Sequence, residues 1–248
     1  MRYEILDSHR TMTDRKRQAL AEFFCEVKGI PSENVASQVD FCTWYEREFA
    51  VKWFEVIVWD SGAVVGYLRC LRDPADVRRW FIGDVHVRAA YRRRGIAGGM
   101  YERTIRELHG FETAETVVSA VGRDNARSIG LHKKYGFHDT GKPCEFANFF
   151  AAEDETMYQK QLYQFLPVPG AERAEPRILP LWTEWKKYAG EYRNEDETVK
   201  SLRWALQKAE KGEATFEAVW CGARLVGFAT DATGERFVYL PEDGRFGK

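Results

Sequence analysis

The sequence predicts an α/β (α+β) protein with a central mixed, mostly antiparallel sheet flanked by helices, followed by a smaller C-terminal half-domain. Three observations lead to this fold class. The predicted elements run in the order β-α-α-β-β-β-α-β-α-β-β, which is mixed rather than strictly alternating. A segment rich in proline and charge follows near residue 170. Beyond that segment, the order α-α-β-β occurs a second time.

The chain begins with a strand, two helices and a hairpin. Leu20, Phe23 and Val27 recur at the spacing of an amphipathic helix, which Gly29 ends. Two β-branched and aromatic runs meet at Asp60-Ser61-Gly62, which indicates a hairpin turn. The strands are expected at Met1–Leu6, Trp53–Trp59 and Ala63–Leu71, and the second helix at Ser37–Phe49.

The next elements enclose a turn rich in glycine and arginine, Tyr91–Gly99. Tyr101, Ile105 and Leu108 lie on one face of the helix that follows this turn. A second, short helix is expected to end at Gly136. The remaining elements are strands at Trp80–Val87, Thr116–Val121, Glu145–Phe150 and Thr156–Tyr163, and the short helix at Asn125–Tyr135.

Three of the eight prolines lie in Leu166–Pro176, which is therefore predicted to be a linker. The expected domains are residues 1–165 and 177–248, with residues 166–176 between them. A shift of 161 positions places Val58-Trp59 on Val219-Trp220 and Val65-Gly66-Tyr67 on Val226-Gly227-Phe228. The C-terminal domain is thus interpreted as a partial repeat of the N-terminal half, although two unrelated hairpins would give a similar match.

Composition excludes several classes of protein. The 248 residues include 37 basic and 38 acidic side chains, so a dominantly basic nucleic-acid binder is not expected. Apolar runs are too short for a membrane span, and the N-terminus does not resemble a signal peptide. The five cysteines are scattered without CxxC spacing, which argues against a disulfide framework or a zinc site. We expect a cytoplasmic protein without a bound metal.

The turn Arg92–Ala97 is the first candidate for a ligand site. It lies between a predicted strand and a predicted helix, where backbone N–H groups without partners and the positive helix end can bind an anion such as a pyrophosphate. Glycines here let the backbone approach phosphate oxygens, and arginines add charge-assisted contacts. An isolated motif of this kind is more often a solvated basic turn, so a second motif is needed.

The second motif lies about thirty residues further on and runs from Asn125 to Phe137. Together the two motifs resemble the GNAT superfamily of acyl-CoA-dependent N-acyltransferases, whose phosphate loop reads Q/R-x-x-G-x-G/A and whose next helix reads close to N-x-x-A-x-x-L-Y-x-K-x-G-F. The resemblance covers roughly residues 1–165 and implies the GNAT fold. The matching residues are Arg92, Gly95 and Ala97 in the first motif and Asn125, Leu131, Lys134, Gly136 and Phe137 in the second.

The resemblance implies a site for acetyl-CoA as co-substrate. The pyrophosphate would lie on Arg92–Ala97, and the pantetheine arm would run beside Val85–Val87 as an additional strand. The acyl group would then lie near Asp84–Val87. The implied binding residues are Val85, Val87, Arg92, Arg93, Arg94, Gly95, Ile96, Ala97, Gly98 and Asn125.

Acetylation of an amine needs a base, donors for the oxyanion and an acid for the thiolate. Family members often carry the base on the strand before the loop, where Asp84 and His86 lie on one face. Both side chains could instead form hydrogen bonds to nearby loops. The frequent family acid is a tyrosine that His132 replaces here, so the candidate acids are His132 and Tyr135.

We therefore expect an N-acetyltransferase that transfers the acetyl group directly, in a ternary complex, to a primary amine of a small molecule or a protein. The alternative is a non-catalytic acyl-CoA-binding module with a regulatory or interaction role. A third interpretation is an RNA- or ribosome-associated modifying enzyme. No second phosphate loop is recognised in the C-terminal half-domain. That half-domain is expected to cover the acceptor cleft or to mediate a homodimer.

Overall fold

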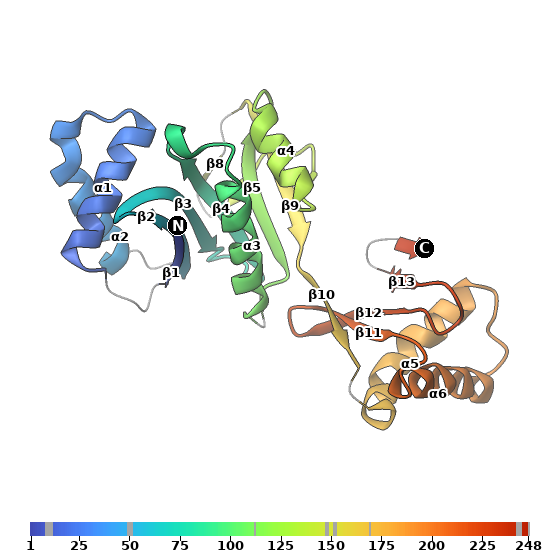
Figure 1. The fold of residues 1–248 in the computed structure, drawn as a ribbon. Coiled ribbons are helices and arrows are strands. Elements are labelled where there is room, and N and C mark those ends of the chain that lie inside the picture. Colours follow the sequence, from blue (N-terminus) through green and yellow to red (C-terminus); the bar gives the residue numbers. More distant parts are fainter. Residues whose placement is uncertain are drawn as a thin grey trace. The chain divides into compact units, whose positions relative to one another are not determined.

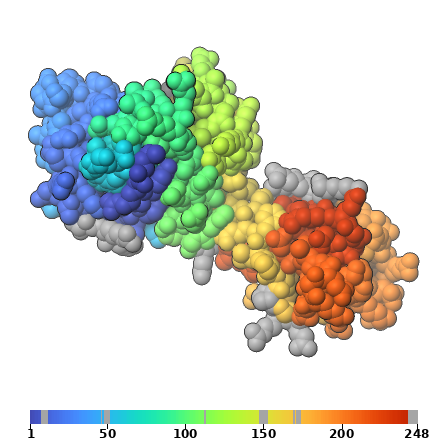
Figure 2. All heavy atoms as spheres, viewed as in Figure 1, coloured from blue at the N-terminus to red at the C-terminus, as the bar shows by residue number. Residues whose placement is uncertain are grey.

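The computed structural model describes residues 1–7, 12–48, 52–111, 113–146, 149–150, 153–168, 170–241 and 245–247. The chain divides between Leu162 and Tyr163 into an N-terminal unit and a C-terminal unit (Figure 1). In the space-filling view each unit is a continuous body of packed atoms (Figure 2).

A seven-stranded sheet in the order β1-β2-β3-β4-β5-β9-β6 forms the centre of the N-terminal unit. All neighbouring strands in it are antiparallel except β4 and β5, which are parallel. The predicted mixed, mostly antiparallel sheet is therefore confirmed. Its strands are β1 (Arg2–Asp7), β2 (Trp53–Asp60), β3 (Ala63–Arg72), β4 (Arg79–Val87), β5 (Thr116–Gly122), β6 (His138–Asp139) and β9 (Glu155–Gln161).

Helices cover both faces of this sheet (Figure 1). Alternate residues of β2 point to opposite faces, so Ile57 packs with α1 and α2 while Val56 packs with α3. Helix α1 (Asp14–Lys28) begins at the Thr13 cap and ends at Gly29, whose φ of 66° suits glycine. The other helices are α2 (Val35–Glu48), α3 (Ile96–His109) and α4 (Ala126–Lys134).

The C-terminal unit has a five-stranded antiparallel sheet in the order β10-β11-β12-β13-β14, with two helices. Its core is strongly aromatic: Trp182 packs against Phe228, and Phe216 stacks on Phe228 with ring centroids 5.7 Å apart. The elements are β10 (Tyr163–Pro167), α5 (Ala171–Tyr188), α6 (Glu195–Glu210), β11 (Phe216–Cys221), β12 (Arg224–Thr230), β13 (Phe237–Leu240) and β14 (Arg245–Gly247).

Both β-hairpins contain a register shift, and the two shifts lie at positions that differ by the same 161 residues that align the sequences. The register between β2 and β3 shifts between Val58 and Trp59, and the register between β11 and β12 shifts between Val219 and Trp220. Before the shift, Glu55 pairs with Arg69, and Phe216 pairs with Thr230 at the corresponding positions. Two unrelated hairpins would share a β-bulge at matched residues only by coincidence, so this observation favours the repeat.

The structure differs from the sequence prediction in the segment 166–176. Strand β10 extends to Pro167 and α5 begins at Ala171, so most of this segment is regular structure rather than linker. Proline at a sheet edge is compatible with a strand, because it lacks only the N–H of one ladder bond. Two further prolines, Pro176 and Pro180, lie inside α5.

The strand expected at Glu145–Phe150 is instead two short antiparallel strands of a separate sheet, β7 (Glu145–Phe146) and β8 (Phe149–Phe150), with residues 147–148 outside the described part. Phe49, the expected end of the second helix, also lies outside the described residues. No helix in the part of the chain that the structure describes combines the length and apolar character needed to cross a bilayer.

Candidate functional site

Strands β4 and β5 separate after three residue pairs. Their parallel pairing runs from Arg79 with Thr116 to Phe81 with Val118, and then ends. At the fork, the Ser119 hydroxyl donates a hydrogen bond to the Ile82 carbonyl at 2.9 Å. The rest of β4 therefore presents a strand edge to the opening, and an extended ligand can pair with such an edge.

Val85 and Val87, two of the predicted binding residues, lie on this free part of β4. Both side chains are half-buried and pack against the core beneath α3. The backbone of these residues, rather than their side chains, is what the edge offers to a ligand.

A bulge in β4 places Asp84 beside the opening. Tyr67 pairs with His86 and Arg69 pairs with Gly83, so β4 contains one more residue than β3 across this step. Asp84 has a φ of 50°, a left-handed conformation that residues other than glycine adopt only when their surroundings hold them there. The bulge interrupts the pleat, and the direction of Asp84 depends on its contacts.

The predicted phosphate loop connects β4 to α3. Arg93 has a φ of 62°, and Gly95, the residue that caps α3, has a φ of 78°. The first bond within α3 runs from the Gly99 N–H to the Gly95 carbonyl at 2.9 Å, so the N–H groups of Ile96, Ala97 and Gly98 precede the helical ladder. This geometry is a concave set of N–H groups at a positive helix end, which suits an anion.

The side chains of this loop have different environments. Arg92, Arg93 and Arg94 are exposed, and Arg92 Nε donates to the Val87 carbonyl at 3.2 Å. Ile96 is buried in the core, so only its backbone faces the loop. A Cβ at Gly95 would meet no described atom within 4 Å, which leaves space for a bulky ligand.

Position 98 requires glycine for a different reason. A Cβ at this position would lie 2.5 Å from the Tyr135 hydroxyl, so the missing side chain makes room for the Tyr135 ring. The ring is half-buried against the first turn of α3, and its hydroxyl donates a hydrogen bond to Glu102 Oε1 at 3.1 Å. Tyr135 is therefore next to the phosphate loop, although the sequence motif places it on another helix.

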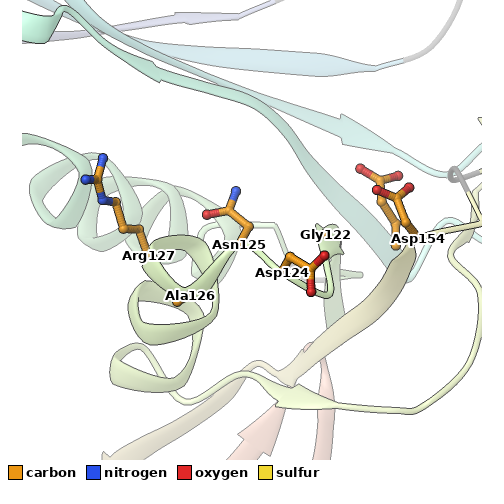
Figure 3. Close-up of a pocket in the computed structure, with 7 residues that line it drawn as sticks. Gly122, Asp124, Asn125, Ala126, Arg127 and Asp154 are labelled. Atoms are coloured by element: carbon orange, nitrogen blue, oxygen red, sulfur yellow. The ribbon is translucent and has the colours of Figure 1, made fainter.

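Asn125 caps the N-terminus of α4, where its Oδ1 accepts a hydrogen bond from the Ser128 N–H at 3.1 Å. It lines an open hollow of about 660 Å³ at the end of β5. Figure 3 shows Asn125 and Arg127 on the first turn of α4 and Asp154 on the opposite side of the hollow. The amide group of Asn125 thus faces open space at the end of the strand that borders the split.

Asp84 is contacted by side chains from three elements. Its Oδ2 lies 3.2 Å from Arg69 Nη1, and its Oδ1 lies 3.1 Å from Lys28 Nζ and 3.6 Å from His86 Nε2. Partial burial by itself would raise the pKa of Asp84, but His86, Arg69 and Lys28 together lower this pKa well below its ordinary value. Asp84 is therefore ionised at neutral pH and is a weak proton acceptor.

His132 lies in the core of the N-terminal unit, with only 2% of its surface exposed. Its Nδ1 lies 2.8 Å from the Ser128 carbonyl, and its Nε2 lies 2.8 Å from the Tyr101 hydroxyl. Since a carbonyl only accepts, Nδ1 carries a hydrogen, and in the neutral ring Nε2 accepts from Tyr101. Nδ1 is thus engaged within α4, and Nε2 is engaged in a contact between α3 and α4.

Sequence reasoning missed three titratable residues near the site: Lys28 and Arg69, which contact Asp84, and Glu55. Glu55 on β2 is fully buried and accepts hydrogen bonds from Tyr67 and Arg69. Burial raises the pKa of the Glu55 carboxyl, an effect that Arg69 and Tyr67 only partly oppose. A glutamate within an otherwise apolar strand was the only signal in the sequence.

A known protein family matches the part of the chain that contains these residues. The family model described as "Acetyltransferase (GNAT) family" matches residues 17–137, which include most of α1, all of α2, the β4 bulge, the loop and α4. No curated protein matches the sequence.

The solved structures that match this chain share little sequence with it. An N-acetyltransferase from Staphylococcus aureus Mu50 is 19% identical, with 65% of this chain and 99% of that chain covered and a TM-score of 0.47. An acyl-CoA N-acyltransferase from Pseudomonas aeruginosa is 17% identical, with 64% and 98% covered and a TM-score of 0.47. The ribosomal-protein-S18-alanine N-acetyltransferase from Escherichia coli is 15% identical, with 65% and 94% covered and a TM-score of 0.46.

The environment of His132 predicts a pH dependence of stability. Burial lowers the pKa of His132 below its ordinary 6.5, although the hydrogen bond to Ser128 acts in the opposite direction. The unfolded chain then binds a proton that the folded chain excludes, so this contribution is complete above the unfolded pKa and is lost as the pH falls. The free energy of unfolding, measured by urea denaturation, should fall less between about pH 7.5 and about pH 5.5 in His132→Gln than in wild type. Equal losses would contradict this account of the buried imidazole.

Proposed function

We infer the reaction from the family and the site together: residues 17–137 belong to the GNAT acetyltransferase family, and we propose that this chain transfers an acetyl group from acetyl-CoA to a primary amine. The family supports the more general statement that this domain is an acyl-CoA-dependent acyltransferase. The acetyl donor and the amine acceptor are the parts that we propose. The observation that carries the proposal is the open edge of β4 leading directly into the loop at the start of α3.

The described residues fit an acyl-CoA. The loop offers three N–H groups, exposed arginines and open space at Gly95 for a pyrophosphate. The edge of β4 beyond Phe81 offers backbone groups to the amides of a pantetheine arm. Asn125, at the end of β5, supplies a further amide.

His86 is the residue to which we assign the base. The structure gives Asp84 a lowered pKa, so Asp84 is better suited to hold His86 than to take the proton itself. His86 is partly exposed on the free part of β4, with Nε2 3.6 Å from the Asp84 carboxylate. An ionised carboxylate in this position can orient the imidazole and balance its charge after a proton is taken up.

In the proposed reaction the acceptor ammonium loses a proton to His86, and its nitrogen then attacks the thioester carbonyl. The new N–C bond forms, the nitrogen gives up its second proton to solvent, the C–S bond breaks, and the thiolate takes a proton from the acid as it leaves. Backbone N–H groups at the open edge are candidate donors to the oxyanion. We assign the acid to Tyr135, which lies against Gly98 in the first turn of α3, rather than to His132, whose two nitrogens are engaged in the core.

A small amine remains the proposed acceptor, and a homodimer remains an untested expectation. The five cysteines are all free thiols, which is compatible with the proposed location in a reducing cytoplasm. The replacement of the family tyrosine by a buried histidine favours one rival, a module that binds acyl-CoA without catalysis. Turnover measurements separate the two, because a binder releases no free thiol from acetyl-CoA.

Thiol release from acetyl-CoA with a panel of small amines tests the proposed base. We expect wild type to turn over at least one amine and His86→Gln to lower kcat by about 10²- to 10⁴-fold, the usual contribution of a general base. Binding of acetyl-CoA should be retained in the variant. Wild-type binding without any turnover would support the non-catalytic module instead.

Isothermal titration with acetyl-CoA tests the loop. In Gly95→Ala a side chain must adopt a φ of 78°, which costs roughly 1–2 kcal/mol and disturbs the N–H groups of the loop. We expect acetyl-CoA affinity to fall by about tenfold or more, which corresponds to about 1.4 kcal/mol. Gly130→Ala is the control, because a Cβ there meets no described atom within 4 Å and the residue lies within α4. Equal affinities for the two variants would contradict a binding role for this turn.

A further inference from the structure

A chain of polar side chains connects the buried interior of the N-terminal unit to Asp84. Glu55 accepts a hydrogen bond from the Tyr67 hydroxyl, and Arg69 Nε lies 2.8 Å from that hydroxyl and 3.4 Å from Glu55 Oε1. The other end of the same guanidinium, Nη1, lies 3.2 Å from Asp84 Oδ2. We call Glu55, Tyr67 and Arg69 the buried triad.

The triad is also fixed from the helical side. The Arg69 guanidinium lies over the Tyr45 ring of α2, with 3.9 Å between its central carbon and the ring centroid. Arg69 is 8% exposed and Glu55 is 1% exposed, so water has little access to either charge. A planar guanidinium stacked on one side and bound at two edges has a single orientation.

The C-terminal unit shows that this hairpin does not need such a triad. At the corresponding positions of β11 and β12 the residues are Phe216, Phe228 and Thr230. The register is the same: Phe216 faces Thr230 as Glu55 faces Arg69. Phe216 and Phe228 stack on each other within an aromatic core, and the Thr230 hydroxyl donates to the Thr215 carbonyl, so two apolar side chains and one neutral hydroxyl fill the same positions of the repeat.

Stability alone does not explain why the N-terminal hairpin carries the buried triad. Burying a carboxylate and a guanidinium carries a desolvation penalty that often equals or exceeds their attraction, and well-packed apolar residues are frequently more stable. One oxygen of Glu55, Oε2, is buried with no hydrogen-bond partner in the described part of the chain. The buried triad is therefore a less favourable way to fill a core than apolar side chains are. Its Arg69 end contacts Asp84 in the candidate site.

We propose that the buried triad positions the catalytic pair of this enzyme: Glu55 and Tyr67 fix Arg69, and Arg69 holds Asp84 on the β4 bulge in the orientation from which it holds His86. This inference rests on the proposed function, because it concerns the base of that reaction. It explains how Asp84 keeps a φ of 50° without being a glycine. The triad residues are positioning residues and do not contact the reacting atoms.

Two conservative variants test the triad. Glu55→Gln keeps the shape of the side chain and replaces its carboxyl with an amide, and Tyr67→Phe removes one hydroxyl. We expect each to lower kcat by at least about tenfold, a substantial part of a general base's contribution, with KM for acetyl-CoA unchanged. Tyr101→Phe is the matched control, because it also removes one buried, hydrogen-bonded hydroxyl, here the partner of His132, and should leave kcat within about twofold.

A double-mutant cycle separates positioning from general destabilisation. If Glu55 acts through Asp84, then Glu55→Gln should cause no further loss of kcat in an Asp84→Asn background. Additive losses, or a Glu55→Gln enzyme with wild-type kcat, would overturn the inference. Thermal unfolding of each variant shows whether the protein is folded at the assay temperature.

A wild-type protein that turns over no amine contradicts the proposed function, and the triad is then tested by structure. Crystal structures of Glu55→Gln and Tyr101→Phe compare the backbone at Asp84. The inference predicts that Asp84 leaves its left-handed conformation in Glu55→Gln and keeps it in Tyr101→Phe. An unchanged Asp84 in Glu55→Gln would overturn it.

Discussion

The separation of β4 from β5 after Phe81 is the constraint on which the candidate site depends. A parallel pair normally continues as far as both strands are extended, because every further residue adds ladder hydrogen bonds. Here the pairing stops after three residues, and the Ser119 hydroxyl satisfies the Ile82 carbonyl at the fork. The free edge of β4, the bulge at Asp84 and the loop at the start of α3 then follow one another along a single stretch of chain. One local interruption of the sheet thus brings backbone donors, a carboxylate and a positive helix end to the same region.

The two units share the backbone register of one β-hairpin, but different side chains are buried against it. In both, a β-bulge interrupts the hairpin between a valine and a tryptophan, and an antiparallel pair packs against two helices. The C-terminal unit fills its interior with Trp182, Phe216 and Phe228. The N-terminal unit replaces part of that apolar interior with charged and hydroxyl groups that lead to β4. Because the backbone register is shared, the difference lies in the side chains, and the polar set marks the unit that carries the candidate site.

Local patterns in the sequence predicted most of the elements and the position of the loop between β4 and α3. The loop is defined by glycine conformations and helix-start geometry within a few residues, so the segment Arg92–Gly98 could be recognised without knowledge of the fold. Alternating strands and helical spacing likewise predicted most of the N-terminal sheet. The mixed sheet and the family are confirmed, and the roles of individual site residues remain proposals.

Contacts between distant segments could not be predicted in this way. Lys28, Arg69 and Asp84 lie on three different elements, and their meeting depends on the register of the sheet and on where α1 ends. Glu55 is one polar residue in the run WFEVIVWD, where nothing indicates its partners. The start of β10 was missed because only Leu162 separates it from β9, and the prolines around residue 170 suggested a linker where α5 begins.

Hydrogen–deuterium exchange with and without acetyl-CoA tests the central claim most directly, because it reports on the free strand edge itself. If the cofactor pairs with β4 and binds the loop, backbone amides in residues 83–99 and in the first turn of α4 should become protected on addition of acetyl-CoA. The C-terminal unit should show no comparable change. Protection confined to the C-terminal unit, or binding without protection of residues 83–99, would contradict the account.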